Sequence, residues 1–325
     1  MPAVRWGVIG PGAIAVGFAD AMTMVEGGEI VAVASRSMER ADAYADRYGI
    51  ATRYDDYAAL ADDPQVDVVY VATPQSRHAD DAHVMLGAGK HLLCEKPFAL
   101  NEAQARRMVE EARAGNLFMM EAIWSRFLPA YRSLVDVVAS GRIGEPQLVE
   151  ADFGFRRPLE KEHRLFRADL GGGGLLDLGI YPLQLCTLLL GPVEHVAAEG
   201  VIGETGVDEL VAAVLRHGAG RLGVIKSALR VNMTCGARVS GTEGVIEIPA
   251  LMHCPNSLRV LSPTGIDEFD AAYEGNGLRF EIEEVHRCLS EGRTESDVMP
   301  LDETLRLAHT LDEIRRQIGL VFPGE

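Results

Sequence analysis

Residues 4–15 read VRWGVIGPGAIA, and this stretch decides the fold. The run 4–9 is mostly apolar, and Gly10, Gly12 and Ala15 follow it in the pattern G-x-G-x-x-A. After a strand, the first glycine permits a tight turn, the second lets the main chain approach a pyrophosphate, and a small third residue lets helix and strand pack closely. The stretch predicts the first turn of a dinucleotide-binding βαβ unit, with a plain tight turn as the alternative.

The helix that follows the glycines would complete the phosphate site. It is predicted to begin near Ala13, so that the N–H groups of Ala13 and Ile14 lie in its first turn. Unpaired N–H groups and the positive end of a helix dipole attract phosphate. We therefore expect Gly10, Gly12, Ala13 and Ile14 to contact the cofactor.

The second predicted strand, 29–34, indicates which dinucleotide is bound. An NAD-specific domain usually ends this strand with an acid for the ribose 2′-hydroxyl, about 20 residues beyond the glycines. Here the strand is followed by Arg36, which lies 36 − 15 = 21 residues after Ala15. A guanidinium suits a 2′-phosphate, so the sequence predicts NADP as the cofactor; a solvated turn charge is the alternative. Further candidate donors are Ser35, Ser37 and Arg40.

The bulk composition is that of an ordinary globular protein. The 325 residues are 47% hydrophobic and 24% charged, and this length favours two domains. The net charge of 31 − 48 = −17 disfavours nucleic acid and anionic membranes as partners. The five cysteines form no C-x-x-C pair and the N-terminus lacks a signal-peptide pattern, so we expect a cytoplasmic protein. No apolar run is expected to span a bilayer.

Strands alternate with helices in the first part of the chain. Predicted strands cover 4–9, 29–34, 66–71, 91–94 and 117–121, with a weaker one at 52–54. Predicted helices cover 13–25, 38–48, 77–88 and 102–114. Ser37 precedes one of these helices and Asn101 another, as helix-capping residues do. This alternation predicts an N-terminal Rossmann domain, a doubly wound parallel sheet, over residues 1–122.

The pattern changes after Trp124. Longer alternating stretches at 147–155, 209–215, 221–227 and 237–248 are separated by glycine-containing turns, and helical patterns at 278–291 and 301–318 close the chain. Alternation of this length is typical of an antiparallel sheet. We expect residues 123–325 to form an α+β domain with a large open, mostly antiparallel sheet that binds substrate.

Two segments carry candidates for proton transfer. The first is C-E-K-P at 94–97, at the carboxyl end of a predicted parallel strand, where open α/β sheets bind their ligands. The second is GGGGLLDLGIYPLQL at 171–185, in which Asp177 and Tyr181 are four residues apart and share one predicted helix face. A phenol has a reference pKa of about 10, which a nearby ammonium lowers. We expect Lys96 to assist Tyr181 in this way, while Asp177 orients the lysine or binds a second hydroxyl.

Each of these residues also has a structural interpretation. Lys96 is then a surface charge, Tyr181 a core aromatic residue and Asp177 a helix-start residue, and the sequence does not show that the two segments meet. The run Gly171–Gly174 has two interpretations as well, a flexible lid or a close approach of main chain to cofactor or substrate.

The motifs together resemble a known family. G-P-G-A-I-A, VATPQSRH, CEKP and GGGGLLDLGIY occur in the order found in the glucose-fructose oxidoreductase and inositol dehydrogenase (Gfo/Idh/MocA) family, and they cover nearly the whole chain. LFMMEAIWSRFLP, LLDLGIYPLQL, ETGVDE and VSGTEG are similar more narrowly to the dimeric dihydrodiol dehydrogenases, whose animal members also act as NADP-dependent D-xylose dehydrogenases. Many family members carry histidine at the position of Tyr181, whereas this branch has tyrosine.

The resemblance implies a Rossmann domain followed by an open-faced β-sheet domain that often forms a dimer. It implies that Lys96 lies by the nicotinamide and that Asp177 and Tyr181 face the substrate. The cofactor contacts implied or expected beyond the fingerprint and the second strand are Thr73, Pro74, His78, Glu95, Lys96, Trp124 and Arg126. For His78 a structural role is favoured, because it falls in the first turn of a predicted helix.

The leading hypothesis is therefore a homodimeric, NADP-dependent dehydrogenase or reductase acting on a sugar, polyol or trans-dihydrodiol, with Tyr181 as base in oxidation and acid in reduction. A ketoreductase of deoxysugar pathways and a non-catalytic dinucleotide sensor are the alternatives, and the joint presence of Lys96, Asp177 and Tyr181 disfavours the sensor. No H-x-x-x-H pair with a supporting acid is present, so no metal is expected. Candidates of lower rank for reaching the substrate are Arg156, Arg157, His163, Arg164, Phe166 and Arg167.

Overall fold

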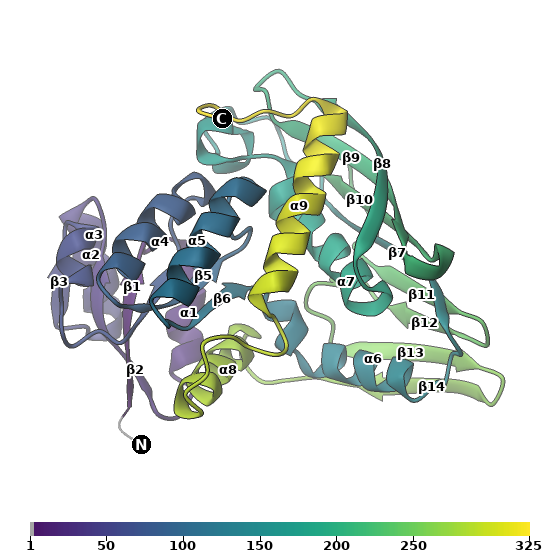
Figure 1. The fold of residues 1–325 in the computed structure, drawn as a ribbon, viewed down its shortest axis with the longest axis horizontal. Coiled ribbons are helices and arrows are strands. Elements are labelled where there is room, and N and C mark those ends of the chain that lie inside the picture. Colours follow the sequence, from purple (N-terminus) through teal and green to yellow (C-terminus); the bar gives the residue numbers. More distant parts are fainter. Residues whose placement is uncertain (1–2) are drawn as a thin grey trace. The chain divides into compact units, whose positions relative to one another are not determined.

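The fingerprint loop joins β1 (Val4–Ile9) to α1 (Ala13–Met22) in the computed structural model, which describes residues 3–325 (Figure 1). Together with five further strands, β1 forms a six-stranded sheet of order β3-β2-β1-β4-β5-β6, and every pairing is parallel. These strands are β2 (Gly28–Ala34), β3 (Thr52–Tyr54), β4 (Val68–Val71), β5 (His91–Glu95) and β6 (Met119–Ala122). The order reverses beside β1, which confirms the predicted doubly wound Rossmann sheet.

Helices connect the strands of this sheet. They are α2 (Met38–Tyr48), α3 (Tyr57–Ala61), α4 (His78–Gly87) and α5 (Glu102–Ala114). All four residues of β4 are buried, as expected for a parallel strand covered on both faces. Asn101 caps α5, because its side chain accepts a hydrogen bond of 2.9 Å from the N–H of Gln104. Ser37 occupies the same position before α2 but makes no side-chain cap.

A second sheet of eight strands has the order β14-β13-β12-β11-β7-β10-β9-β8. Its strands are β7 (Pro146–Gly154), β8 (Val193–Ile202), β9 (Asp208–His217), β10 (Leu222–Ala228), β11 (Ala237–Gly241), β12 (Val245–Ile248), β13 (Ser257–Ser262) and β14 (Gly265–Asp270). Only the pairing of β10 with β7 is parallel among the described strands of this sheet. The predicted large, mostly antiparallel sheet is therefore confirmed, and the stretch predicted at 237–248 is a hairpin of two strands.

The chain passes between two compact units more than once. One unit contains the described residues up to Phe127 together with Glu274–Leu305, and the other contains Leu128–Tyr273 together with Arg306–Glu325. Helix α8 (Leu278–Ser290) thus belongs with the Rossmann sheet, where it contacts α1. The sequence predicts a single boundary after residue 122, because nothing in the local pattern announces this return of the chain.

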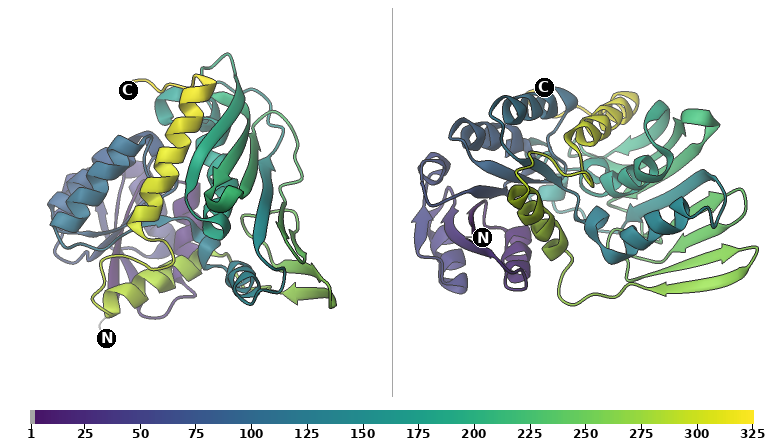
Figure 2. Two further views of the ribbon diagram at one scale, coloured as in Figure 1. Left: turned by 45° about the vertical axis from the view of Figure 1, so that its right-hand side comes forward. Right: turned by 60° about the horizontal axis from the view of Figure 1, so that its bottom comes forward.

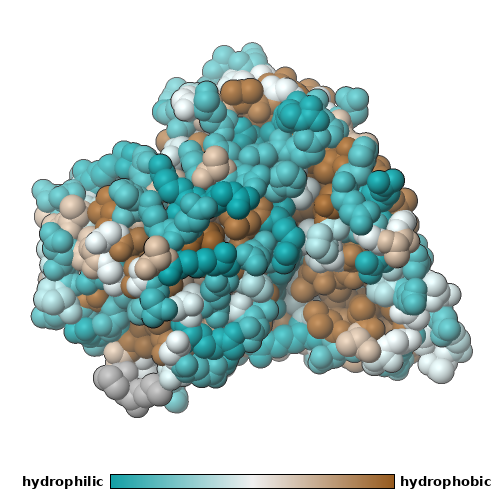
Figure 3. All heavy atoms as spheres, in the orientation of Figure 1, coloured by the Kyte–Doolittle hydropathy of each residue, from teal (hydrophilic) through white to brown (hydrophobic). Residues whose placement is uncertain are grey.

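The eight-stranded sheet is covered on one face. Helix α7 (Ile180–Leu190) packs against β7 and β10, and α6 (Pro129–Ala139) contacts β13 and β14 (Figure 2). Along β9 every second side chain is buried on the covered face and its neighbours are exposed on the other. In the space-filling view of Figure 3, apolar residues also gather on the second unit, where Figure 1 shows α6 and α7.

One helical stretch corrects an expectation about membranes. Residues Ala168–Leu190 are long and apolar enough to cross a bilayer, although the sequence led us to expect no such run. In the structure, 89% of its most apolar window is buried inside the protein, and α7 forms its second half. The apolar character of this stretch is explained by its position in a protein core.

Candidate active site

The fingerprint loop has the shape that a dinucleotide phosphate requires. Gly10 adopts φ +76°, and a Cβ there would lie 2.8 Å from the main chain of Ala72 and Thr73, so only glycine fits. Gly12 is the residue before α1 and offers no side-chain cap, and the first turn of this helix contains no acidic residue. The first N–H groups of α1, at Ala13 and Ile14, therefore remain available for an anion.

The end of β2 places polar side chains beside this loop in the sheet. Ser35 is buried and its Oγ accepts a hydrogen bond of 3.3 Å from the N–H of Ser37. Arg36 and Arg40 are exposed, and neither forms an ion pair with a carboxylate of residues 3–325. The guanidinium of Arg36 is near enough to Tyr57 to lower the pKa of its hydroxyl, although burial raises that pKa by more. Two guanidinium groups without acidic partners are thus grouped at the carboxyl end of β2, next to the nucleotide loop.

The segment after β4 is held by a histidine. His78 is fully buried, and its ring nitrogens lie 2.9 Å from the carbonyl oxygens of Thr73 and Pro97. Burial lowers the pKa of His78, whereas the hydrogen bonds to the two carbonyl oxygens raise it. These contacts support the favoured structural role, because His78 ties the loop after β4 to the loop after β5. Thr73 Oγ1 is buried without a hydrogen-bond partner in residues 3–325, so it is open to a ligand.

The E-K-P segment directs its two charged side chains differently. Glu95 is buried and accepts a hydrogen bond of 2.5 Å from the Tyr70 hydroxyl and another of 3.1 Å from the N–H of Lys96. Lys96 remains partly exposed at the carboxyl end of β5. Glu281 of α8 is fully buried near Glu95, and burial followed by the charge of Glu95 raises its pKa. The structure thus anchors the glutamate inside and leaves the lysine at the ligand-binding edge of the sheet.

Trp124 and Arg126 lie in a short 3-10 helix, Trp124–Phe127, that follows β6. Trp124 is partly exposed, whereas the Arg126 side chain is only 3% exposed and its Nη2 donates to Glu303 Oε1 at 2.7 Å. Glu121 lies in the same buried region and accepts the N–H of Phe98 at 3.0 Å, and its burial raises its pKa to about 7. Arg126 therefore belongs to a buried ion pair, and its contact with a cofactor stays a prediction.

In the second unit, the candidate acid–base residues lie at the start of one helix. Residues Leu175–Gly179 form a π-helical turn that continues into α7, and such turns are frequent at functional sites. Asp177 is buried and receives two hydrogen bonds from Arg164, of 3.1 and 3.2 Å, in a bidentate pair. Arg164, a candidate of lower rank in the sequence, is thus the partner of one of the leading residues.

Tyr181 is buried against a pair of aromatic rings. Its ring centroid lies 5.7 Å from that of Phe153 on β7 and 5.3 Å from that of His253. Phe153 and His253 are themselves stacked, with centroids 4.4 Å apart, and both are partly exposed. Neither residue is among those expected from the sequence. Phe153 could have been found because it lies in a predicted strand, on the face whose side chains are mostly buried. His253 lies in a loop whose sequence has no periodic pattern to reveal it.

The run Gly171–Gly174 is packed rather than free. A Cβ at Gly172 would lie 2.6–2.9 Å from carbonyl oxygens of residues 164, 165 and 167, and a Cβ at Gly173 would overlap Asp208 Oδ1. The glycines therefore permit a close approach to the chain's own main chain and to Asp208. The other residues of lower rank lie nearby: Phe166 is in a hydrophobic cluster, and Arg167 pairs with Asp169.

Lys96 belongs to one compact unit and Tyr181 to the other, so their predicted cooperation remains a prediction. Among residues 3–325 there is no group of three or more His, Cys, Asp or Glu side chains placed to hold a metal ion.

The chain matches two family models. Residues 4–122 match the GFO/IDH/MocA oxidoreductase family with an NAD-binding Rossmann fold, and residues 131–247 match the GFO/IDH/MocA C-terminal domain. Trans-1,2-dihydrobenzene-1,2-diol dehydrogenase of Mus musculus is 38% identical, with 99% of each chain covered. The enzyme of that name from Homo sapiens is 37% identical over the same shares.

Two solved structures extend this similarity. The 3-ketoreductase KijD10 of Actinomadura kijaniata, in complex with NADP and TDP-benzene, has a TM-score of 0.88 and 27% identity, covering 97% of this chain and 98% of that one. The aldose-aldose oxidoreductase of Caulobacter crescentus, complexed with glycerol, has a TM-score of 0.88 and 25% identity, covering 97% of both. Fold and relatives define an oxidoreductase with an NAD(P)-binding domain. The chain belongs to the GFO/IDH/MocA family.

Proposed function

We propose that the protein is an NADP-dependent oxidoreductase that moves a hydride between nicotinamide and a hydroxyl or carbonyl carbon of a sugar, polyol or trans-dihydrodiol. The observation that carries the proposal is the placement of Asp177 and Tyr181 on one helix start, with Tyr181 packed against the stacked rings of Phe153 and His253. The dihydrodiol dehydrogenases, the ketoreductase and the aldose oxidoreductase named above support this range of substrates. Because all five cysteines are unpaired, we place the enzyme in the cytoplasm.

The first unit fits the dinucleotide that the fold implies. Its glycine loop and the start of α1 would hold the pyrophosphate, the unpartnered Thr73 Oγ1 would donate to the cofactor, and Arg36 with Arg40 would hold the 2′-phosphate. The bound dinucleotide would supply the hydride acceptor or donor. Lys96, at the carboxyl end of β5, would lie by the nicotinamide.

The chain's own residues would handle the proton and orient the substrate. We assign Tyr181 as the group that takes the hydroxyl proton in oxidation and returns it in reduction, with the Lys96 ammonium stabilising the phenolate. Asp177, oriented by its bidentate bond to Arg164, would accept a hydrogen bond from a second hydroxyl of the substrate. A substrate with two neighbouring oxygens would therefore be bound at both.

Replacing Arg36 with alanine is expected to weaken NADP binding by about 10- to 100-fold and to change NAD binding little. A charge-assisted hydrogen bond contributes roughly 1.5–3 kcal/mol, and only NADP carries the 2′-phosphate. Isothermal titration with both dinucleotides measures the change. Arg47→Ala is the matched control, because Arg47 is an exposed arginine of α2 that lies 3.8 Å from Asp20. Equal loss of NAD and NADP affinity would show that Arg36 is only a surface charge.

The experiment that tests the function is a substrate panel. Purified protein is mixed with NADP or NADPH and with aldoses, polyols, trans-dihydrodiols and nucleotide-linked keto-sugars, and absorbance of NADPH is followed. We expect turnover with a sugar, polyol or diol that offers neighbouring hydroxyl groups. Turnover with nucleotide-linked keto-sugars alone would favour the ketoreductase, which the similarity to KijD10 makes the second candidate. Tight NADP binding without turnover of any substrate would make the protein a dinucleotide sensor.

We also propose that the open face of the eight-stranded sheet binds a second copy of the chain. A row of paired residues crosses five neighbouring strands on this face with charges that alternate in sign: Glu150, Arg238, Glu247, Arg259 and Glu268. On β8, β9 and β10 the same face also carries an apolar site, where the exposed Val214 is paired with Ala197 and Val224. A two-fold axis that offsets the row by one strand would bring opposite charges of the two copies together.

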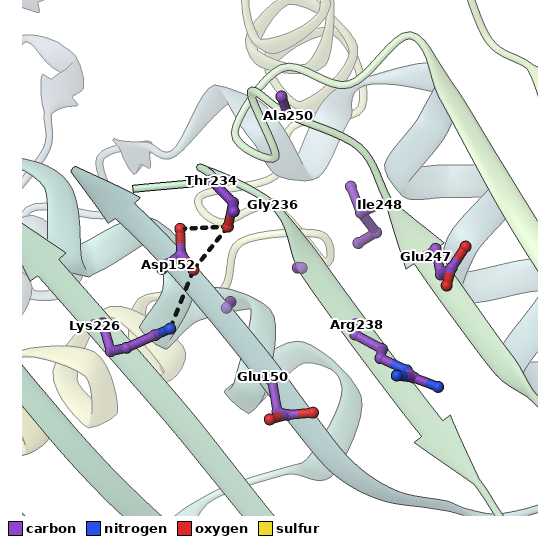
Figure 4. Close-up of a pocket in the computed structure, with 11 residues that line it drawn as sticks. Glu150, Asp152, Lys226, Thr234, Gly236, Arg238, Glu247, Ile248 and Ala250 are labelled. Carbon is purple, nitrogen blue, oxygen red and sulfur yellow. Dashed lines mark hydrogen bonds and ion pairs between the residues drawn. The ribbon is translucent and has the colours of Figure 1, made fainter. Parts of the chain in front are cut away.

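A shallow pocket lies on this face, lined by residues of β7, β10, β11 and β12 that include Glu150, Asp152 and Arg238 (Figure 4). In it, Asp152 accepts hydrogen bonds from Thr234 and from the N–H of Cys235, and it pairs with Lys226 at 3.2 Å. The charges of Asp152 and Lys226 are therefore paired within the chain, which lowers the cost of covering these two side chains with a partner.

Introducing a carboxylate by Val214→Glu should convert the proposed dimer to a monomer, because it would bury an unpaired charge at the apolar site that Val214 forms with Ala197 and Val224. Multi-angle light scattering should change from twice the chain mass of 35.2 kDa to that mass itself. Val135→Glu, at an equally exposed valine of α6, should leave the dimer intact. A wild-type mass of 35.2 kDa at every concentration would refute the dimer.

A further inference from the structure

The helix that carries Asp177 and Tyr181 begins without a cap from its own segment. Gly174 is the residue before the π-helical turn Leu175–Gly179, and it has no side chain to accept the first N–H groups. A buried helix start needs acceptors for these groups. The chain supplies one from a distant strand.

That acceptor is Asp208, the first residue of β9. Its Oδ2 accepts a hydrogen bond of 2.6 Å from the N–H of Leu175, which lies 33 residues earlier in the chain. Asp208 is fully buried, and its other oxygen, Oδ1, has no hydrogen-bond partner among residues 3–325, so the contact of Oδ2 with the helix start is the hydrogen bond that the structure gives this carboxylate. A negative charge at this end of a helix is favourable, because it opposes the positive end of the helix dipole.

The surrounding chain is built around this contact. Gly173 adopts φ +125°, and a side chain there would overlap Asp208 Oδ1; a Cβ at Gly174 would lie 3.3 Å from Oδ2. Val207, the residue before Asp208, is fully buried in a hydrophobic cluster that also contains Leu178 of the π-helical turn. The carboxylate and the turn are thus fixed to the same core, and the two glycines leave room for the carboxylate.

We propose that Asp208 is a positioning residue, whose carboxylate fixes the first turn of the helix and thereby the orientation of Tyr181 toward the substrate. This inference rests on the proposed function, in which Tyr181 exchanges a proton with substrate. It gives the E-T-G-V-D-E segment, residues 204–209, a role in the reaction although Asp208 touches no substrate.

The electrostatic surroundings make this contact sensitive to pH. Burial raises the pKa of Asp208 to about 6, against the N–H groups of Leu175 and Gly174 and the charge of Arg315 on α9 (Leu301–Ile318), which lower it. Arg315 is the charged side chain that lowers the pKa of Asp208 through its electrostatic field. Gly173 and Gly174, which lie against the carboxylate, contribute only main-chain atoms. Above pH 6 the carboxylate accepts strongly from the helix start, and below it the protonated acid accepts more weakly.

The test is Asp208→Asn, which keeps the shape and removes the charge. We expect kcat to fall by about 10- to 100-fold, as for a modest misplacement of a reacting group, with NADP affinity unchanged. In the wild type, kcat should fall as the pH decreases through about 6, and this limb should be absent in the variant. Glu209→Gln is the control, because Glu209 is the neighbouring carboxylate and pairs with Arg230 at 3.7 Å instead of the helix. It should keep both kcat and the limb.

Hydrogen exchange provides a second measurement that does not depend on activity. Amide exchange in a peptide covering residues 172–181 should be faster in Asp208→Asn than in Glu209→Gln. The measurement is made at pH 7.5, about 1.5 units above the pKa of Asp208, so that this carboxylate is ionised in Glu209→Gln. If Asp208→Asn does not fold, Gly173→Ala takes its place, because its added methyl group pushes the carboxylate away without removing it. This variant should also show a lower kcat and faster amide exchange in residues 172–181. Wild-type kcat in Asp208→Asn, or a lowered kcat that keeps the acid limb, would overturn the proposal. Absence of any turnover in the wild type would instead refute the proposed function, while exchange still reports on Asp208.

Discussion

Tyr181→Phe is expected to reduce turnover by roughly 10²- to 10⁴-fold, the usual contribution of a positioned acid–base group. The substitution keeps the ring and therefore its packing against Phe153 and His253, and it removes only the atom that exchanges a proton. Affinity for NADP and the melting temperature should change little. Steady-state kinetics with the best substrate of the panel, together with titration of NADP, measure these quantities.

Tyr131→Phe is the matched control for this variant. Tyr131 is another buried tyrosine of the same unit, and its hydroxyl donates to the carbonyl oxygen of Met252 at 3.0 Å. The variant loses this hydrogen bond and the one of 3.1 Å that Gln184 Nε2 donates to the hydroxyl, so the free energy of unfolding should fall by about 1–3 kcal/mol while turnover stays within a few-fold of the wild type. Near-normal turnover in Tyr181→Phe would mean that another group carries the proton and that Tyr181 is a packed aromatic residue.

Lys96→Met is expected to reduce turnover by a similar factor, since it removes the ammonium and keeps the length of the side chain. If the lysine and the tyrosine act as one unit, the double variant should be little worse than the poorer single variant. Lys161→Met is the control, because Lys161 is an exposed lysine that pairs with Glu204 at 3.0 Å. Independent losses that multiply in the double variant would show that Lys96 and Tyr181 act in separate steps.

The first unit could be predicted from the sequence because its signals are local. Gly10 and Gly12 follow a strand directly, Arg36 ends the next strand, and Asn101 caps a helix within three residues of its partner. Such patterns act over a few residues, where strand period, turn geometry and capping decide the conformation. The six-stranded parallel sheet follows from their alternation.

In the second unit, the contacts around the candidate site join residues that are far apart in the chain, so they could not be predicted from local sequence patterns. Asp177 and Tyr181 could be found from their motif, but Phe153 and His253 reach Tyr181 from a strand and a loop far away in the chain. The cap of Asp208 on the helix start spans 33 residues, and no period or turn residue encodes a contact of this kind. Register between distant strands, which sets these contacts, depends on tertiary packing rather than on local preference.

The central claim, hydride transfer by this chain, is tested most directly by isotope transfer. NADPH that carries deuterium at the transferred position of C4 is incubated with the protein and the keto form of a substrate, and the product is analysed by mass spectrometry. If the chain transfers the hydride, we expect one deuterium on the carbon that becomes the carbinol carbon, and we expect the rate of deuteride transfer to be at least about 10²-fold lower in Tyr181→Phe. Product without deuterium at that carbon, or no product from any keto-sugar, aldose or diketone offered, would contradict it.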